Sequence, residues 1–167
     1  MKRTRVLTFT AVMAALANVM SLPLFAIPLQ LGGFTSSVHF FQLAIFLCGI
    51  LAGPWAGLLG GAVGSLYMSV TTIPFILGGI AILGGSVGLF AEKVRPFFAC
   101  LLAWLIQAPY VFVTDYVWFT LFAPPRSSIG ALLIVTPIMV NLTLQAIVCA
   151  ILANIITHYV KRAGINL

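Results

Sequence analysis

Residues 129–159 read IGALLIVTPIMVNLTLQAIVCAILANIITHY, and no Asp, Glu, Lys or Arg interrupts them. A helix of about 20 apolar residues spans the hydrocarbon core of a bilayer, so this stretch suffices for one crossing. The 167-residue chain is 62% hydrophobic and 6% charged, whereas soluble domains carry about 25% charged residues. We therefore predict an all-α integral membrane protein that forms a single membrane domain over residues 1–167.

Proline, glycine and charged residues divide the chain into six apolar stretches. The divisions fall at Pro23, at Gly53-Pro54, at Pro74, at the charged cluster 92–95 and at the loop 122–128. The segment between the first two stretches contains three hydroxyl side chains and is predicted as a polar loop. The predicted transmembrane helices are 6–22, 38–51, 55–70, 74–91, 96–121 and 129–159.

The eight basic residues indicate the orientation of these helices. With a cytoplasmic N-terminus, six crossings leave Arg126 outside and place the other seven inside, as the positive-inside rule requires. Both termini are therefore predicted to be cytoplasmic, in a multi-pass protein of the cytoplasmic membrane with the lipid bilayer around it. Nucleic acid is excluded as a partner, because the basic residues stand at the ends of apolar runs and not on one stripe. The seven inner basic residues are Lys2, Arg3, Arg5, Lys93, Arg95, Lys161 and Arg162.

Motifs for enzymatic or metal chemistry are weak. The three cysteines lie in apolar runs and match neither a zinc spacing nor a C-x-x-C pair, so we predict buried thiols, no metal site and no cofactor. Residues 84–88 formally fit the G-x-S-x-G pattern of serine hydrolases. His39 and His158 lie near opposite ends of the predicted bundle, however, and neither is placed to act as a base for Ser86. An enzyme is therefore not predicted.

Polar side chains within the apolar runs indicate a binding pocket. Asp115 is the one acid inside a predicted span, where an ionisable group costs roughly 2.5–3.5 kcal/mol on insertion scales. Asn141 and Gln145 stand four residues apart and share one helix face, at a depth similar to that of Asp115. Together with nearby aromatic rings, such groups suit a small, flat, polar ligand. The predicted substrate-binding residues are Asp115, Asn141, Gln107, Gln145, His39, Gln42, Tyr110, Tyr116, Trp118 and Tyr67.

Several of these residues also have a purely structural interpretation. Asp115 could form an ion pair with Arg126, or extend its carboxylate towards the membrane surface. Tyr116 and Trp118 match the belt of aromatic residues found at membrane boundaries. His39 could hydrogen-bond a carbonyl of the preceding loop.

Small residues mark a close helix contact. Gly53, Gly57 and Gly61 repeat every four residues and give the third helix a face with almost no side chains. Another backbone can approach such a face closely. We predict packing within the bundle as its use.

The motifs together resemble the S components of energy-coupling factor (ECF) transporters, six-helix subunits that capture vitamins and related micronutrients. The resemblance rests on the basic N-terminus leading into the alanine-rich residues 11–15, on the polar loop, and on the segment from His39 through LAGPWAG (51–57) to Gly64. It implies a pocket on the outer side of the membrane, covered by the loop between the first two helices. In that family two cytoplasmic ATPases drive transport, and this chain contains no phosphate-binding loop of its own.

The resemblance also implies a docking face on the first helix. Ala11 and Ala15 would contact the transmembrane coupling subunit there, although packing within the bundle is an equal alternative for these alanines. Ala14 is followed four residues later by Asn18, so the chain departs from a perfect A-x-x-x-A repeat.

Three functions follow from these observations. The first is the substrate-binding subunit of an ATP-driven ECF-type uptake transporter for a small-molecule micronutrient. The second is a self-sufficient secondary carrier in which Asp115 couples transport to protons. The third, ranked last, is an intramembrane enzyme dependent on Ser86 or His39. One acid and several amides favour a ligand with hydrogen-bond donors or a positive charge, and the aromatic residues favour a ring system.

Overall fold

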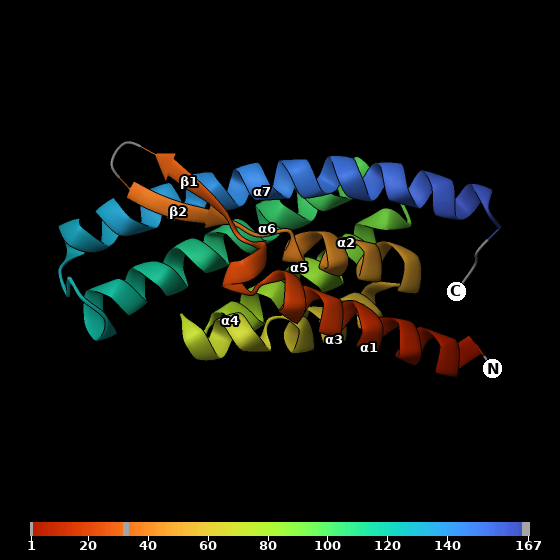
Figure 1. Ribbon diagram of the computed structural model, residues 1–167, viewed down its shortest axis with the longest axis horizontal. Helices are drawn as coiled ribbons and strands as arrows, with labels where there is room; N and C mark the ends of the chain where they lie inside the picture. The colour runs from red at the N-terminus through yellow and green to blue at the C-terminus, as the bar shows by residue number, and fades with distance from the viewer. Residues whose placement is uncertain (1, 32–33, 165–167) are drawn as a thin grey trace.

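The computed structural model describes residues 2–31 and 34–164, and most of them are helical (Figure 1). The helical character predicted from the sequence is confirmed. In chain order the elements are α1 (Lys2–Met20), the 3-10 turn η1 (Pro23–Phe25), strands β1 (Ile27–Leu31) and β2 (Phe34–Val38), helices α2 (Phe41–Ala52), α3 (Pro54–Gly64), α4 (Leu66–Thr71), α5 (Ile76–Ala91) and α6 (Pro96–Val117), the π-helical turn η2 (Trp118–Phe122), and helix α7 (Ser128–Arg162).

The segment predicted as a polar loop forms an antiparallel β-hairpin. Ile27 pairs with Val38 at its open end, and Leu31 pairs with Phe34 at the other. Thr and Val favour extended backbone, whereas the prediction of a loop rested on the three hydroxyl side chains of this segment. The prediction of a loop is therefore wrong for β1 and β2.

The predicted third span, 55–70, is not one helix. It breaks at Ser65, whose φ of −107° and ψ of 6° lie outside the helical range, and continues as the short helix α4. The other predicted stretches each hold one helix with shifted ends. The first helix begins at Lys2 and the last extends to Arg162, because the basic residues at both ends continue the helices beyond the apolar runs.

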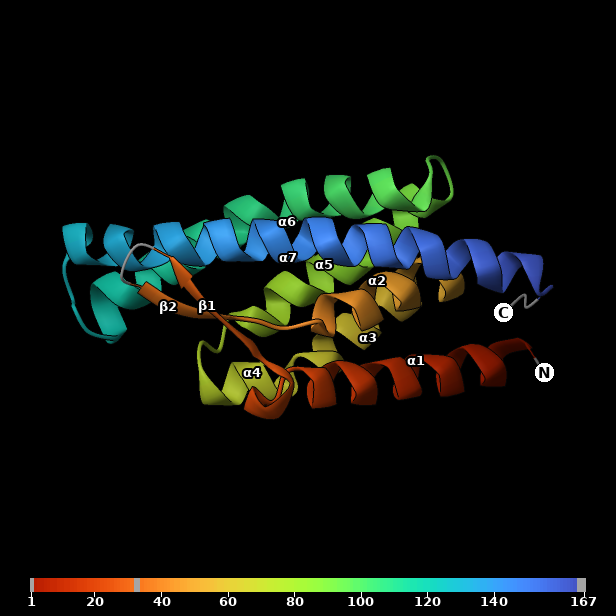
Figure 2. The same ribbon diagram turned by 45° about the horizontal axis from the view of Figure 1, so that its top comes forward.

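Two helical segments have the length and composition to cross a membrane. They are Pro96–Phe122, of 27 residues, and Ser128–Arg162, of 35 residues. Helices α2 and α5 are apolar but shorter. Both termini lie at the same end of the bundle, and the hairpin lies towards the opposite end (Figures 1 and 2). This arrangement agrees with an even number of crossings.

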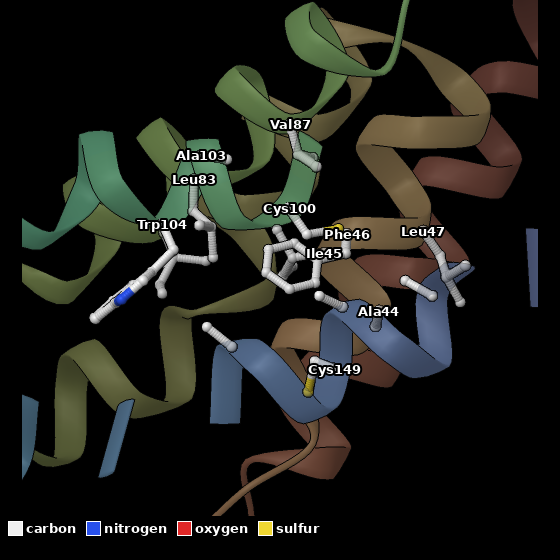
Figure 3. Packing of buried hydrophobic residues seen from close by; sticks show 14 of the residues in the cluster. Ala44, Ile45, Phe46, Leu47, Leu83, Val87, Cys100, Ala103, Trp104 and Cys149 are labelled. Carbon is white, nitrogen blue, oxygen red and sulfur yellow. The ribbon is translucent and has the colours of Figure 1, made fainter. Parts of the chain in front are cut away.

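The hydrophobic core lies between α2, α5, α6 and α7 (Figure 3). Ile45 and Phe46 of α2 are completely buried there, together with Leu83 of α5 and Cys100 of α6. All three cysteines are buried, as predicted. The core holds these four helices together at the middle of the bundle.

Glycines bring α3 and α5 into backbone contact. A Cβ atom added at Gly84 would overlap the carbonyl oxygen of Gly57, and one added at Gly61 would overlap that of Ile80. The predicted use of Gly57 and Gly61 for packing within the bundle is confirmed. Gly53 differs, because it ends α2 with a φ of +90° and no neighbour occupies the space its side chain would take.

We predict that Gly84→Ala destabilises the protein by about 1–3 kcal/mol, because the added methyl group meets backbone that cannot move aside. Gly85→Ala is the matched control on the same helix, since the three atoms nearest to its Cβ would all belong to the side chain of Leu58, the first at 3.3 Å. Thermal melting of both variants in detergent measures the difference. A melting temperature for Gly84→Ala equal to that of Gly85→Ala would contradict the contact.

Candidate functional site

A cavity of about 270 Å³ lies beside strand β2, whose Ser37 forms part of its wall. Strand β2 and helices α2, α4, α5, α6 and α7 all contribute to its wall. The lining residues are Ser37, His39, Phe41, Met68, Thr72, Ile73, Phe75, Ile76, Ile80, Gln107, Val111, Thr114, Asp115, Ile138, Asn141, Leu142 and Gln145.

The polar wall of the cavity comes from α6 and α7. Gln107 is 1% exposed, Asp115 4% and Gln145 2%, so these side chains are withdrawn from the protein surface. No residue of the described ranges forms a hydrogen bond or an ion pair with the Asp115 carboxylate. Arg126 instead donates to the carbonyl of Phe122 at 3.5 Å, so the ion pair considered from the sequence does not form.

Two amides of α7 hold the hairpin over the cavity. The carbonyl of Ser37 accepts a hydrogen bond from Asn141 Nδ2 at 3.0 Å and another from Gln145 Nε2 at 3.2 Å. The hairpin therefore uses two hydrogen-bond donors of the polar wall. Within the described part of the chain, the Oε1 atoms of Gln107 and Gln145 have no hydrogen-bond donor. With the Asp115 carboxylate, they give the cavity a surplus of acceptors.

The opposite wall is apolar. Ile76 and Ile80 of α5 lie along it, and Ile73 and Phe75 precede them in the connection from α4. Met68 of α4 extends this surface. The cavity thus offers a hydrophobic side and an acceptor-rich side to one small ligand.

Five of the ten residues predicted from the sequence line this cavity, namely Asp115, Asn141, Gln107, Gln145 and His39. The other five predicted residues are not among the lining residues of this cavity. The Gln42 side chain is fully buried in the bundle. The Tyr110 hydroxyl donates to the carbonyl of Phe75 at 3.3 Å, and Tyr116 stacks on Phe112.

Trp118 and Tyr67 are also engaged outside the cavity. The Trp118 indole packs edge-on against Phe75, with ring centroids 6.2 Å apart. The backbone N–H of Tyr67 donates to Asn18 Oδ1 at 2.9 Å. The Trp118 ring therefore packs against a residue of the cavity wall, and Tyr67 contacts α1 through its backbone.

The sequence interpretation missed Met68, Thr72 and Thr114 among the lining residues. Thr114 could have been predicted from the sequence, because it directly precedes Asp115 in the same polar stretch of the helix. Thr72 could not, because the break at Ser65 changes the helical phase of every residue after it. A continuous 3.6-residue period does not predict which face of α4 meets the cavity.

The first helix leaves two of its alanines at the surface. Ala11 and Ala15 are exposed, whereas Ala14 and Ala17 are buried in the bundle. Leu7 and Val12 extend the exposed apolar surface next to these alanines. This face of α1 is open to another apolar surface.

The described residues contain no group of three or more His, Cys, Asp or Glu side chains that could hold a metal ion. A family model for the ECF-type riboflavin transporter, S component, matches residues 1–162. The match agrees with the resemblance drawn from the sequence. No curated protein matches the chain.

We predict that the double variant Asn141→Leu/Gln145→Met releases the hairpin, because the Ser37 carbonyl loses both of its donors. Each lost hydrogen bond should cost about 0.5–1.5 kcal/mol. Limited proteolysis of residues 27–38 measures the release as faster cleavage. Thr143→Val is the matched control, because its hydroxyl donates only to Met139 within α7. Equal cleavage rates in the double variant and this control would rule out the contact.

Proposed function

The chain belongs to the family of S components of ECF-type riboflavin transporters, and we propose that it binds a flavin for ATP-driven uptake. A transporter S component binds substrate and is not an enzyme. Riboflavin is the proposed ligand of this particular chain. The residues of the cavity wall are the proposed contacts.

The main support for a flavin ligand is that polar groups of the cavity lack hydrogen-bond partners in the described residues. A buried donor or acceptor without a partner costs about 1–3 kcal/mol, and a charged group costs more. Gln107 and Asp115 both line the cavity, and neither Gln107 Oε1 nor the Asp115 carboxyl group has a hydrogen-bond partner in the described residues. A ligand that donates hydrogen bonds to them recovers that free energy, which an apolar ligand cannot do.

A flavin has the two surfaces that the cavity requires. Its tricyclic ring suits the apolar wall of Ile73, Ile76 and Ile80. Its hydroxylated side chain and ring N–H supply donors for Asp115 and Gln107. The cavity volume of about 270 Å³ is slightly below the roughly 300–1,000 Å³ typical of ligand pockets, which suits a single small ligand.

The proposed topology has six membrane crossings and cytoplasmic termini, in the cytoplasmic membrane. The location of both termini at one end of the bundle supports it (Figure 1). The charge distribution supports it as well, because only Arg126 of the eight basic residues falls outside. In this orientation the cavity and the hairpin lie on the outer side, where substrate arrives.

S components of ECF transporters work with a transmembrane coupling subunit and ATPases. We propose that the coupling subunit docks on the α1 face that contains Ala11 and Ala15, and that two cytoplasmic ATPases supply the energy. The exposure of these alanines beside Leu7 and Val12 supports this location. Small residues allow close approach of another helix in the bilayer.

One observation favours a second function. Asp115 is a carboxyl group without a partner among the described residues, and such groups in membrane helices often carry protons. A proton-coupled carrier would use Asp115 in this way and would need no ATPase.

We predict that riboflavin raises the melting temperature of the purified chain, because the ligand binds only the folded state. At 100 times the dissociation constant the stabilisation is about 2.7 kcal/mol. Asp115→Asn should weaken binding by roughly 10- to 150-fold, as expected for the loss of a hydrogen bond to a charged group. Flavin fluorescence titration gives both affinities.

Tyr110→Phe is the matched control for this measurement. Tyr110 lies on α6, as Asp115 does, but its hydroxyl contacts the Phe75 carbonyl and does not line the cavity. Removal of this hydroxyl should therefore leave the riboflavin affinity at the wild-type value. If riboflavin causes no shift, the flavin proposal is wrong. If Asp115→Asn binds as tightly as Tyr110→Phe, the ligand lies elsewhere.

A further inference from the structure

The break between α3 and α4 is filled by a side chain from α1. In a continuous helix the N–H of Tyr67 would donate to the carbonyl of Val63, four residues earlier. Here Asn18 stands between them. Its Oδ1 accepts from Tyr67 N at 2.9 Å, and its Nδ2 donates to Val63 O at 2.8 Å. Insertion of a side chain into the helical hydrogen-bond ladder is a known cause of such a break.

Asn18 connects two functional surfaces of the chain. On α1 it follows Ala14 by one turn and also donates to the Ala14 carbonyl at 3.0 Å, on the side of the helix that faces the bundle. Ala11 and Ala15 lie on the exposed side of the same helix. Any displacement of α1 by a partner on that side moves Asn18 with it.

Helix α4 forms a wall of the cavity and has few other attachments. Met68 lines the cavity, and so does Thr72 directly after the helix. Val70 is 85% exposed, and the buried hydroxyl of Ser69 has no hydrogen-bond partner in the described ranges. A helix of six residues is too short to be stable alone, so its position depends on contacts with the rest of the chain.

We propose that Asn18 is a positioning residue that transmits docking of the coupling subunit on α1 to the cavity wall formed by α4. The inference rests on the proposed docking face and the proposed cavity. The Asn18 side chain hydrogen-bonds to both sides of the break. Helix α4 therefore moves with α1 when the partner displaces α1. Asn18, which interrupts the alanine repeat, thereby connects the docking face to the ligand site.

Hydrogen–deuterium exchange of residues 66–72 tests this proposal without any ligand. In Asn18→Leu the Tyr67 amide loses its acceptor and should exchange roughly 2- to 12-fold faster than in the wild type. Asn18→Asp keeps an acceptor oxygen and should restore protection of Tyr67. Thr10→Val is the control on α1, because the Thr10 hydroxyl donates to the Val6 carbonyl of the same helix and neighbours Cys48 of α2, and neither partner belongs to the α3–α4 break.

The decisive comparison adds the coupling subunit with its ATPases, and co-purification confirms docking of each variant. Docking should change exchange of residues 66–72 in the wild type and in Thr10→Val, but not in Asn18→Leu. A response in Asn18→Leu equal to that of the wild type would overturn the proposal.

Riboflavin affinity provides a second readout on the same samples. Docking should change it by about 5- to 150-fold in the wild type, the usual range of allosteric coupling, and by less than about 3-fold in Asn18→Leu. An equal change in both proteins would also overturn the role of Asn18. Failure of the wild type to bind riboflavin would instead reject the proposed ligand, and the exchange comparison would still decide the role of Asn18.

Discussion

The hydrocarbon interior of a bilayer offers no hydrogen bonds, so every backbone group that leaves a regular helix there needs a partner within the protein. In this chain three side-chain amides meet that need. Asn18 pairs with the two backbone groups separated at the α3–α4 break. Asn141 and Gln145 pair with the Ser37 carbonyl of the hairpin. Both of these irregular parts of the fold border the cavity and depend on these bonds.

The same bonds explain how a rigid bundle can contain an adaptable site. Glycine contacts hold α3 and α5 backbone to backbone, and the core of α2, α5, α6 and α7 is closely packed. The hairpin is attached to this bundle by hydrogen bonds from Asn141 and Gln145. Helix α4 is attached by the hydrogen bond to Asn18 and by Met68, which packs against the core. A ligand that competes for the amides of α7 would therefore act on the hairpin. A partner that moves α1 would also act on the core, because Ala17 of α1 belongs to it. This division suits a subunit that binds substrate but takes its energy from elsewhere.

The sequence predicted those features that depend on composition and on short spacings. Hydropathy located the helices, the repeat of Gly57 and Gly61 located the close contact, and the cost of burying Asp115 pointed to the cavity. The helix break was not predicted, because the partners of Asn18 lie 45 and 49 residues further along the chain. The hairpin contact joins residues more than 100 positions apart, 104 for Asn141 and 108 for Gln145. Tyr110 and Trp118 were assigned to the pocket for their chemistry, but their rings pack beside it.

Riboflavin uptake into proteoliposomes tests the central claim most directly. The chain is reconstituted alone and together with the coupling subunit and ATPases, with ATP inside or with a proton gradient. We predict uptake only in the complete assembly with ATP, and none by the chain alone under a proton gradient. Uptake by the chain alone that follows the proton gradient and needs no ATP would contradict a dependent binding subunit and establish a carrier.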